Sequence, residues 1–374
     1  MAQKIKLPLK KFLSFFIMIL LFVFLLFDSK IHAQDIDPED SPAIRQRLEK
    51  LEKLLLEIEK KQKAQEVMSE LQQTEEEKKQ KDEEILDAAG REYTLATPGI
   101  LNISWSISYT GDTYDQLKSV EDENGKKSTQ VRHINSHTLS NSLSFKVPLL
   151  KNLTFSSSIP FSYKYTDSQD SSKTGIGMGD PNFNIQYQPF RPKEGIPTTI
   201  LNAGIIVPLG DNPYQMDDDD EVAIGNGYYS IFAGANFSKS IDPVITFGGI
   251  SYYKNLDVDD AKYNSDIEQK AKGIYISKVS PGDQISANIG MGYSLSYLVS
   301  ISVGFQYSYS YPTEYYWETI GTNESSASYS SSLSIGTNWK ISHKRSVNTN
   351  LNIGLFNSNS DVSFSLSMPF DFKL

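Results

Sequence analysis

The sequence predicts an all-β fold: a transmembrane, antiparallel up-and-down β-barrel of about twelve strands, preceded by an N-terminal α-helical coiled coil. Three observations predict it. The C-terminal residues alternate between apolar and polar side chains, the same period of two recurs from Leu101 onward, and residues 41–82 carry apolar residues at heptad spacing.

The strongest signal is the C-terminal stretch Asp361–Leu374, in which every second residue is apolar. The other phase carries mostly serine and charged residues, with Pro369 as an interruption. A tilted transmembrane strand of about 9–11 residues has this pattern, with apolar side chains facing lipid and polar ones facing the lumen. The alternative is an edge strand of a soluble sandwich, which rarely needs so tall an apolar face. The apolar residues are Val362, Phe364, Leu366, Met368, Phe370, Phe372 and Leu374.

The composition fits a barrel that reaches an outer membrane. The 374 residues include 21 Tyr and 19 Phe, as aromatic girdles require, and no Cys. The lack of Cys excludes disulfides and thiolate metal sites, and it suits a chain that crosses an oxidising periplasm unfolded. The formal net charge of −10 disfavours a nucleic-acid partner, and no pattern indicates a cofactor.

Residues 1–33 read as a signal peptide, and residues 34–40 as the start of the mature chain. The basic stretch Met1–Lys11 precedes an apolar run, Phe12–Phe27, and Ala33 is a suitable last residue before cleavage. The alternative is an uncleaved anchor helix, although the run is slightly short of the roughly 20 residues that a membrane span needs.

Residues 41–82 predict a periplasmic coiled coil. Because a lone helix of this kind is marginal in water, we expect it to make the protein a homo-oligomer. Beyond Ile58 the apolar register weakens. The alternative is an exposed helical spacer. The predicted core residues are Ile44, Leu48, Leu51, Leu55 and Ile58.

Residues 83–99 join the predicted coiled coil to the barrel. A short apolar helical turn is expected before Gly90, and Pro98 prevents further helix. This segment is either a linker or a plug helix in the barrel mouth, and the sequence favours neither. The plug candidates are Ile85, Leu86, Ala88 and Ala89.

Residues 100–374 form the predicted barrel. Long polar connections mostly follow odd-numbered strands and short turns follow even-numbered ones, which places both termini and the coiled coil in the periplasm. Val244–Tyr253 is apolar on both phases, so its orientation stays open. The expected strands are Leu101–Tyr109, Leu139–Leu149, Leu153–Tyr165, Phe183–Tyr187, Thr199–Val207, Tyr229–Phe237, Val244–Tyr253, Ile285–Leu295, Val299–Tyr311, Ala327–Trp339, Val347–Leu355 and Val362–Leu374. Polar loops are expected at Gly111–Gln130, Asp167–Met178 and Asn255–Asp283.

Three short motifs occur in order within this region. They are GIGMGDPNFNIQY from Gly175, NAGIIVPLGDNPY from Asn202 and GNGYYSIFAGANFSKSIDP from Gly225. Their glycine-rich loops and strand ends resemble the family of outer-membrane proteins labelled as the MetA pathway of phenol degradation, often called transporters. The resemblance covers roughly Ile100–Leu374 and implies an outer-membrane transporter barrel.

The order of parts is also similar to the outer-membrane secretion pore of the Fap functional-amyloid system. That resemblance implies that the coiled coil trimerises, that a plug helix gates the lumen and that a polypeptide is exported. It rests on no residue motif, so it assigns no role to an individual residue.

The polar phases of three predicted strands indicate the character of the lumen. They carry short, uncharged, hydrogen-bonding side chains, which give little charge selectivity and would let an unfolded polar polypeptide slide. The alternative is an ordinary wet interior without a selected substrate. The predicted lumen-lining residues are Ser286, Asn288, Ser300, Ser302, Gln306, Ser308, Ser363, Ser365 and Ser367.

Metal and catalytic sites have weak support. The acidic run Asp217, Asp218, Asp219, Asp220 and Glu221 would suit a divalent cation such as calcium, but it lacks the spacing of a calcium loop, and a solvated loop is the alternative. His133 and His137 are four residues apart near a strand start, about 13 Å along an extended chain, which does not suit a shared metal ion. We expect no enzymatic activity.

Taken together, these features predict a gated passive pore of the outer membrane that exports a polypeptide. One alternative is an uptake channel for small hydrophobic or aromatic compounds, and another is a barrel that anchors a structural coiled coil. The expected partners are outer-membrane lipid, further copies of the chain, and the transported polypeptide or small apolar solute.

Overall fold

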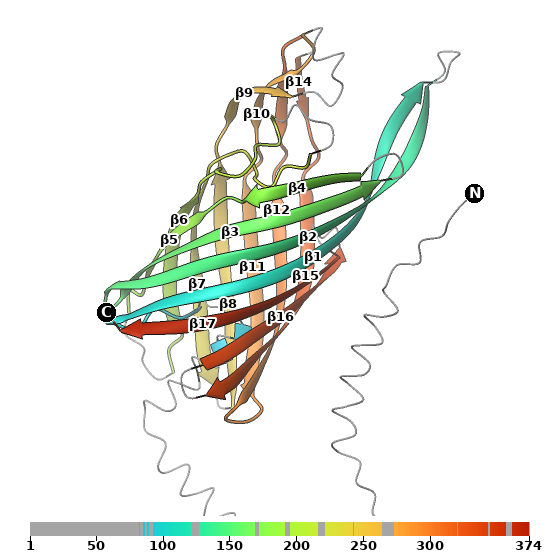
Figure 1. Ribbon diagram of the computed structural model, residues 1–374. Coiled ribbons are helices and arrows are strands. Elements are labelled where there is room, and N and C mark those ends of the chain that lie inside the picture. The colour runs from blue at the N-terminus through green and yellow to red at the C-terminus, as the bar shows by residue number, and fades with distance from the viewer. Residues whose placement is uncertain are drawn as a thin grey trace, which may run out of the picture. The chain divides into compact units, whose positions relative to one another are not determined.

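The computed structural model describes the barrel and a short stretch before it (Figure 1). The predicted signal peptide, residues 34–40 and the predicted coiled-coil core residues lie outside the described part. No helix of the described residues is long and apolar enough to cross a membrane. The described residues are 82, 85–86, 88–89, 93–121, 127–168, 172–190, 195–215, 221–241, 243–263, 273–319, 321–342, 345–356 and 361–373.

Twelve antiparallel strands form a closed ring. β17 closes it by pairing with β1 from Ile100↔Lys373 to Gly111↔Val362. In ring order the strands are β1 (Ile100–Glu121), β2 (Lys127–Leu150), β3 (Leu153–Ser168), β5 (Asn182–Tyr187), β6 (Thr198–Ile206), β7 (Ser230–Ile241), β8 (Val244–Asn255), β11 (Gln284–Ser294), β12 (Val299–Ser310), β15 (Ser328–Ser342), β16 (Arg345–Phe356) and β17 (Val362–Lys373).

Each of the twelve expected strands overlaps one strand of this ring, so the predicted barrel is confirmed. The reason is that a period of two leaves one face apolar along every strand. Outward side chains such as Trp105, Leu143, Ile289 and Phe305 are exposed on the surface that lipid would cover. The strand left open, β8, turns Ile245 and Phe247 inward, where both are buried.

The expected loops contain structure that the sequence did not reveal. Most of Gly111–Gln130 continues the β1–β2 hairpin, which is paired as far as Glu121↔Lys127. The stretch Asp167–Met178 contains β4 (Ser172–Met178), which pairs with the outer part of β3. These two expectations of open loops were therefore wrong, because backbone pairing continues where the side chains are polar.

A second, four-stranded sheet forms from two further connections at the end of the barrel opposite the paired residues Ile100 and Lys373. The long predicted loop Asn255–Asp283 contributes β9 (Val258–Tyr263) and β10 (Ile276–Ser280). The connection between β12 and β15 contributes β13 (Glu314–Trp317) and β14 (Gly321–Glu324). The sheet order is β14-β13-β10-β9, and its strands are too short for periodicity to reveal.

Candidate functional site: the barrel lumen

The inner wall of the barrel is a lattice of hydroxyl and amide side chains. Ser106 and Ser142 are hydrogen-bonded at 2.6 Å across β1 and β2. On the next pair of strands, the Ser144 hydroxyl donates to that of Ser158 at 3.0 Å. Neighbouring serine hydroxyls form hydrogen bonds with one another in this way, so this part of the wall is polar without carrying charge.

The lumen contains a cavity of about 610 Å³ with a mostly uncharged lining. Of the described residues that line it, Lys146 is the one with a charged side chain. Four of the residues expected from the sequence line this cavity: Asn288, Gln306, Ser365 and Ser367.

The other five expected residues lie on the same inward phases. Ser300, Ser302 and Ser308 are buried. The Ser308 hydroxyl donates to Ser286 at 3.3 Å, and the Asn352 amide donates to Ser363 at 3.2 Å. These contacts place all nine residues on the inner wall, whereas their role in transport stays a prediction.

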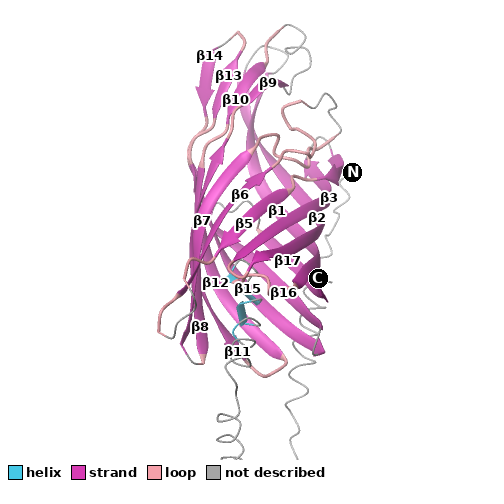
Figure 2. Cartoon of the chain, turned by 90° about the vertical axis from the view of Figure 1, so that its left-hand side faces the viewer, coloured by secondary structure: helices cyan, strands magenta, loops and turns pink. Residues whose placement is uncertain are grey.

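A short piece of chain before β1 lies inside the barrel (Figure 2). Its residues 82, 85, 86, 88 and 89 are helical. A tight turn joins it to β1: the Ile100 N–H donates to the Thr97 carbonyl at 3.0 Å, and Gly99 has φ of +79°, as the third residue of a type II turn after proline requires. We call residues 82, 85–86, 88–89 and 93–97 the inner segment.

Hydrogen bonds hold the inner segment to three strands of the wall. On β12, the Ser302 hydroxyl donates to the Ala88 carbonyl at 2.7 Å. On β11, Asn288 Oδ1 accepts from the Tyr93 hydroxyl at 2.6 Å. On β3, Thr154 Oγ1 accepts from the backbone N–H of Ala96 at 3.0 Å.

Lys146 holds the same segment from β2. Its Nζ donates to the Thr94 carbonyl at 3.1 Å. The charge in the cavity lining thus binds a backbone group of the inner segment.

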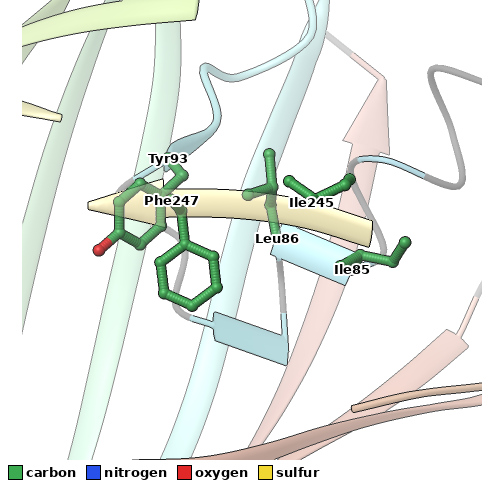
Figure 3. Packing of buried hydrophobic residues seen from close by; sticks show 5 residues of the cluster. All are labelled: Ile85, Leu86, Tyr93, Ile245 and Phe247. Atoms are coloured by element: carbon green, nitrogen blue, oxygen red, sulfur yellow. The ribbon is translucent and has the colours of Figure 1, made fainter. Parts of the chain in front are cut away.

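An apolar cluster anchors the other face of the inner segment (Figure 3). Ile85, Leu86 and Tyr93 pack with Ile245 and Phe247 of β8, and all five are buried. The rings of Tyr93 and Phe247 lie 4.9 Å apart and are tilted by 49°. Burying these side chains away from water stabilises the segment in the lumen.

Two glycines of the wall make room for this contact. A Cβ atom at Gly336 would lie 1.8 Å from the Ala88 carbonyl oxygen. At Gly292 it would lie 2.4 Å from Ile85 Cγ2. Any larger residue at these positions would therefore displace the inner segment.

Two further aromatic rings lie on the inward phases of β7 and β8. Phe232 of β7 and Tyr253 of β8 lie 5.3 Å apart, and Phe247 is on the same phase of β8. The otherwise polar inner wall thus carries aromatic side chains on β7 and β8.

The three sequence motifs meet at one place in the outer part of the wall. Asp180 follows β4 and accepts two backbone hydrogen bonds, from Gly210 N at 3.0 Å and from Asn226 N at 2.7 Å. Gly225 approaches so closely that a Cβ atom there would lie 2.7 Å from Asp180 Oδ1. We call this contact of the three motifs the Asp180 junction.

The Asp180 junction supports the outer sheet through two tyrosines. Tyr214 and Tyr228 pack against the buried cluster of Val258, Ala261, Ile276 and Val279. Burial raises the pKa of both phenols, with further contributions from neighbouring acidic and phenolic groups, so both stay protonated. The Asp180 junction therefore links the barrel wall to the four-stranded outer sheet.

Known structures with the same barrel architecture include an outer-membrane channel. The crystal structure of the COG4313 outer membrane channel from Pseudomonas putida F1 matches with a TM-score of 0.53 at 14% identity, over 76% of this chain and 98% of that one. The chain has the fold of an outer-membrane channel. The resemblance to outer-membrane transporter barrels is thereby confirmed at the level of the fold.

Two more distant barrels match at lower TM-scores. One is the translocator domain of the autotransporter NalP from Neisseria meningitidis, at 8% identity, 79% and 95% coverage and a TM-score of 0.42. The other is the Pseudomonas putida toluene transporter TodX, at 9% identity, 75% and 91% coverage and a TM-score of 0.34. No protein-family model matches the sequence.

The weak metal candidates gain no support from the described residues. Asp217, Asp218, Asp219 and Asp220 lie outside the described part, and Glu221 forms an isolated bridge with Thr174. No group of three or more His, Cys, Asp or Glu among the described residues is placed to hold a metal ion.

His137 belongs instead to the outer surface of the barrel, between two tyrosine rings. Its ring is stacked on Tyr109 at 6.1 Å and on Tyr165 at 6.4 Å, and the Tyr109 hydroxyl is hydrogen-bonded to Nδ1 at 2.8 Å. This is the position of an aromatic girdle.

Sequence reasoning missed several residues of the site. Tyr93, Thr154 and Lys146 carried no visible signal, because their partners are far away in the chain. Gly292 and Gly336 lie on the polar phases of their strands. The available clue was that a glycine inside a strand often marks a place where another part of the chain approaches the backbone closely.

Proposed function

We propose that the protein is a passive channel of the outer membrane in which the inner segment is a plug. The carrying observation is that this segment is fixed inside the lumen by hydrogen bonds to four strands, by an apolar cluster and by two close glycine contacts. With the plug in place, a cavity of about 610 Å³ remains in the lumen of the twelve-stranded barrel.

Export of a polypeptide is the transport that the polar wall favours. An extended chain carries a hydrogen-bonding group at every residue, and the hydroxyls and amides of the wall can exchange partners with it. The wall offers few fixed charges that would trap such a chain.

Uptake of small apolar or aromatic compounds is the second candidate. It is favoured by inward aromatic side chains on β7 and β8: Phe232 and Tyr253 contact each other, and Phe247 packs on the inner segment. In this case movement of the plug would expose Phe247 to the lumen.

The proposal extends to the part of the chain before the plug. The signal peptide at residues 1–33 directs export, and the coiled coil at residues 41–82 joins copies of the chain in the periplasm. If the barrel only anchors that coiled coil, it conducts no ions with or without the plug.

Single-channel recording in planar bilayers tests the plug. We expect the full-length protein to stay closed and a variant lacking residues 35–97 to conduct steadily. If neither protein conducts, the pore function is wrong and the anchoring function takes its place. If both conduct equally, the channel function stands and the plug function is wrong.

A point variant separates loss of the plug from loss of the N-terminal region. Gly336→Ala places a methyl group against the Ala88 carbonyl and should open the full-length channel. Gly304→Ala is the matched control, because its methyl would meet only the rotatable hydroxyl of Ser334 within 3.0 Å. Equal conductance of the two variants would contradict the plug.

A further inference from the structure

One amide side chain breaks the apolar outer surface of the barrel. Asn141 lies on the outward phase of β2, because its strand neighbours Ser140 and Ser142 are hydrogen-bonded to other inward serines. Across the strands it pairs with Ile107 of β1 and Phe161 of β3. Further apolar side chains surround it: Trp105, Tyr109, Leu139, Leu143, Ile159 and Tyr163.

On the outward phases of the described ring strands the one other Asn or Gln is Asn135 of β2, which lies beyond His137 toward the loop end and accepts a hydrogen bond from the Thr113 hydroxyl. Asn141 is four residues from His137 in the girdle and eight from Leu149. These separations are about 13 Å and 26 Å along the strand, or roughly 9 Å and 19 Å in depth at a 45° tilt. The amide therefore lies inside the hydrocarbon layer.

An amide in hydrocarbon without a hydrogen-bond partner is costly. Lipid tails offer none, and no hydrogen bond of the Asn141 side chain forms within the described part of the chain. A neighbouring protein at this face would supply one.

We propose that the outer face of β1–β3 around Asn141 is the interface between barrels of an oligomer of this chain. A carboxamide is both donor and acceptor, so copies of Asn141 that meet at a symmetry axis satisfy one another. The ring of apolar and aromatic side chains around it excludes lipid and supplies the packing area.

A second copy is the occupant because the chain itself predicts self-association. The heptad residues Ile44 to Ile58 precede the first described residue, Asp82, by 24 residues. A coiled coil there would hold the barrels of its members side by side in one membrane. The inference concerns the contact between barrels and does not depend on what passes through them.

Cross-linking in the membrane tests this interface, because the chain contains no Cys. Leu143→Cys places one thiol beside Asn141 and leaves the amide intact. Ile289→Cys on β11 is the matched control: it is outward, 67% exposed and on the opposite side of the ring. Both full-length variants are reconstituted into phospholipid vesicles, and folding is checked by the gel-mobility shift of the unheated barrel.

We expect a thiol-specific cross-linker to join copies of the Leu143→Cys variant and not copies of the Ile289→Cys control. Adding Asn141→Leu to Leu143→Cys should lower the cross-linked fraction by roughly threefold or more, because the amide contact is lost while the surface becomes more apolar. Equal cross-linking of Leu143→Cys and Ile289→Cys, or no effect of Asn141→Leu, would overturn the proposal. Neither outcome of the cross-linking experiment depends on whether the single barrel conducts ions.

Discussion

The side chains that hold the inner segment act mainly on its backbone. Ser302 and Lys146 donate to carbonyl groups, and Thr154 accepts from an N–H group. Water would satisfy the same groups if the segment left, so each neutral bond contributes only about 0.5–1.5 kcal/mol net and the bond of the charged Lys146 about 1.5–3 kcal/mol. A segment held in this way can bind both specifically and reversibly.

Asp180→Asn tests the Asp180 junction. The amide retains one oxygen to accept a hydrogen bond but presents N–H₂ to the second backbone N–H, so one charge-assisted bond is lost. We expect the free energy of unfolding to fall by roughly 1–3 kcal/mol, measured from the urea dependence of the gel-mobility shift.

Asp211→Asn is the control for that experiment. It changes an exposed carboxylate on a neighbouring loop and should leave the unfolding midpoint nearly unchanged. Equal losses in the two variants would show that the effect comes from charge and not from the two backbone contacts.

Asp283 makes the outer end of the barrel sensitive to acid. Partial burial opposes ionisation of its carboxyl, but hydrogen bonds from Tyr252, Lys254 and the Asn255 N–H outweigh it and lower the pKa. The carboxylate therefore stabilises the fold above its unfolded pKa of about 3.9, and this stability is lost as pH falls through the lower folded pKa.

The expected result is that Asp283→Asn weakens amide hydrogen-exchange protection at the outer end at pH 7. The difference from the unmodified protein should shrink as pH falls below about 4. Glu324→Gln, an exposed change on β14, should show no difference at either pH. A difference for Asp283→Asn that persists at about pH 2 would contradict the role of ionisation.

At the scale of elements, side-chain period predicted the barrel strands well. The reason is that each strand between lipid and lumen must alternate. The period could not orient β8, because its inward residues Ile245 and Phe247 are apolar and pack against the inner segment. Because β8 contacts the inner segment there, it lacks the polar phase by which the strand could have been oriented.

The candidate site was only partly predictable. Ile85 and Leu86 stood out as an apolar pair in a charged stretch, which was enough to propose a plug as one of two alternatives. What lies opposite them depends on the ring order and register of the barrel. No local pattern contains that information, because the contacting residues are about 150 or more positions away.

The four-stranded outer sheet depends on one small buried cluster. Val279 is fully buried between β9 and β13. Val279→Ala removes two methylene equivalents and should lower the local stability of the sheet by about 2 kcal/mol. Hydrogen exchange should accelerate in β9, β10 and β13 but not in the barrel.

Thr322→Ala on β14 is the matched control, because Thr322 is exposed in the same sheet. Faster exchange throughout the barrel of the Val279→Ala variant would show that the sheet and the barrel unfold together.

At the scale of the whole molecule, Lys146 should influence the ion selectivity of the lumen. When the inner segment is absent, the Lys146 Nζ no longer donates to the Thr94 carbonyl. Asp371 lies on the same inward phase, beyond Asn102, so the test is the change that Lys146 makes to the reversal potential of the variant lacking residues 35–97 in a potassium chloride gradient.

Lys146→Gln in the same truncated background should shift that reversal potential toward cation selectivity, because one positive charge leaves the wall. Lys151→Gln, at an exposed position in the turn between β2 and β3, is the control and should leave the reversal potential nearly unchanged. Equal reversal potentials of the truncated pore with and without Lys146→Gln would contradict this role.

If the inner segment is a plug, as proposed, the turn at Thr97–Ile100 determines how the channel closes. A plug that leaves the lumen remains tethered to the rim by a few residues, so it experiences its binding site at an effective concentration in the millimolar range. Closure is then a first-order event whose rate does not depend on how many channels the membrane contains. A free peptide with the sequence of the inner segment would have to reach about millimolar concentration to compete with the tethered segment for the same binding site.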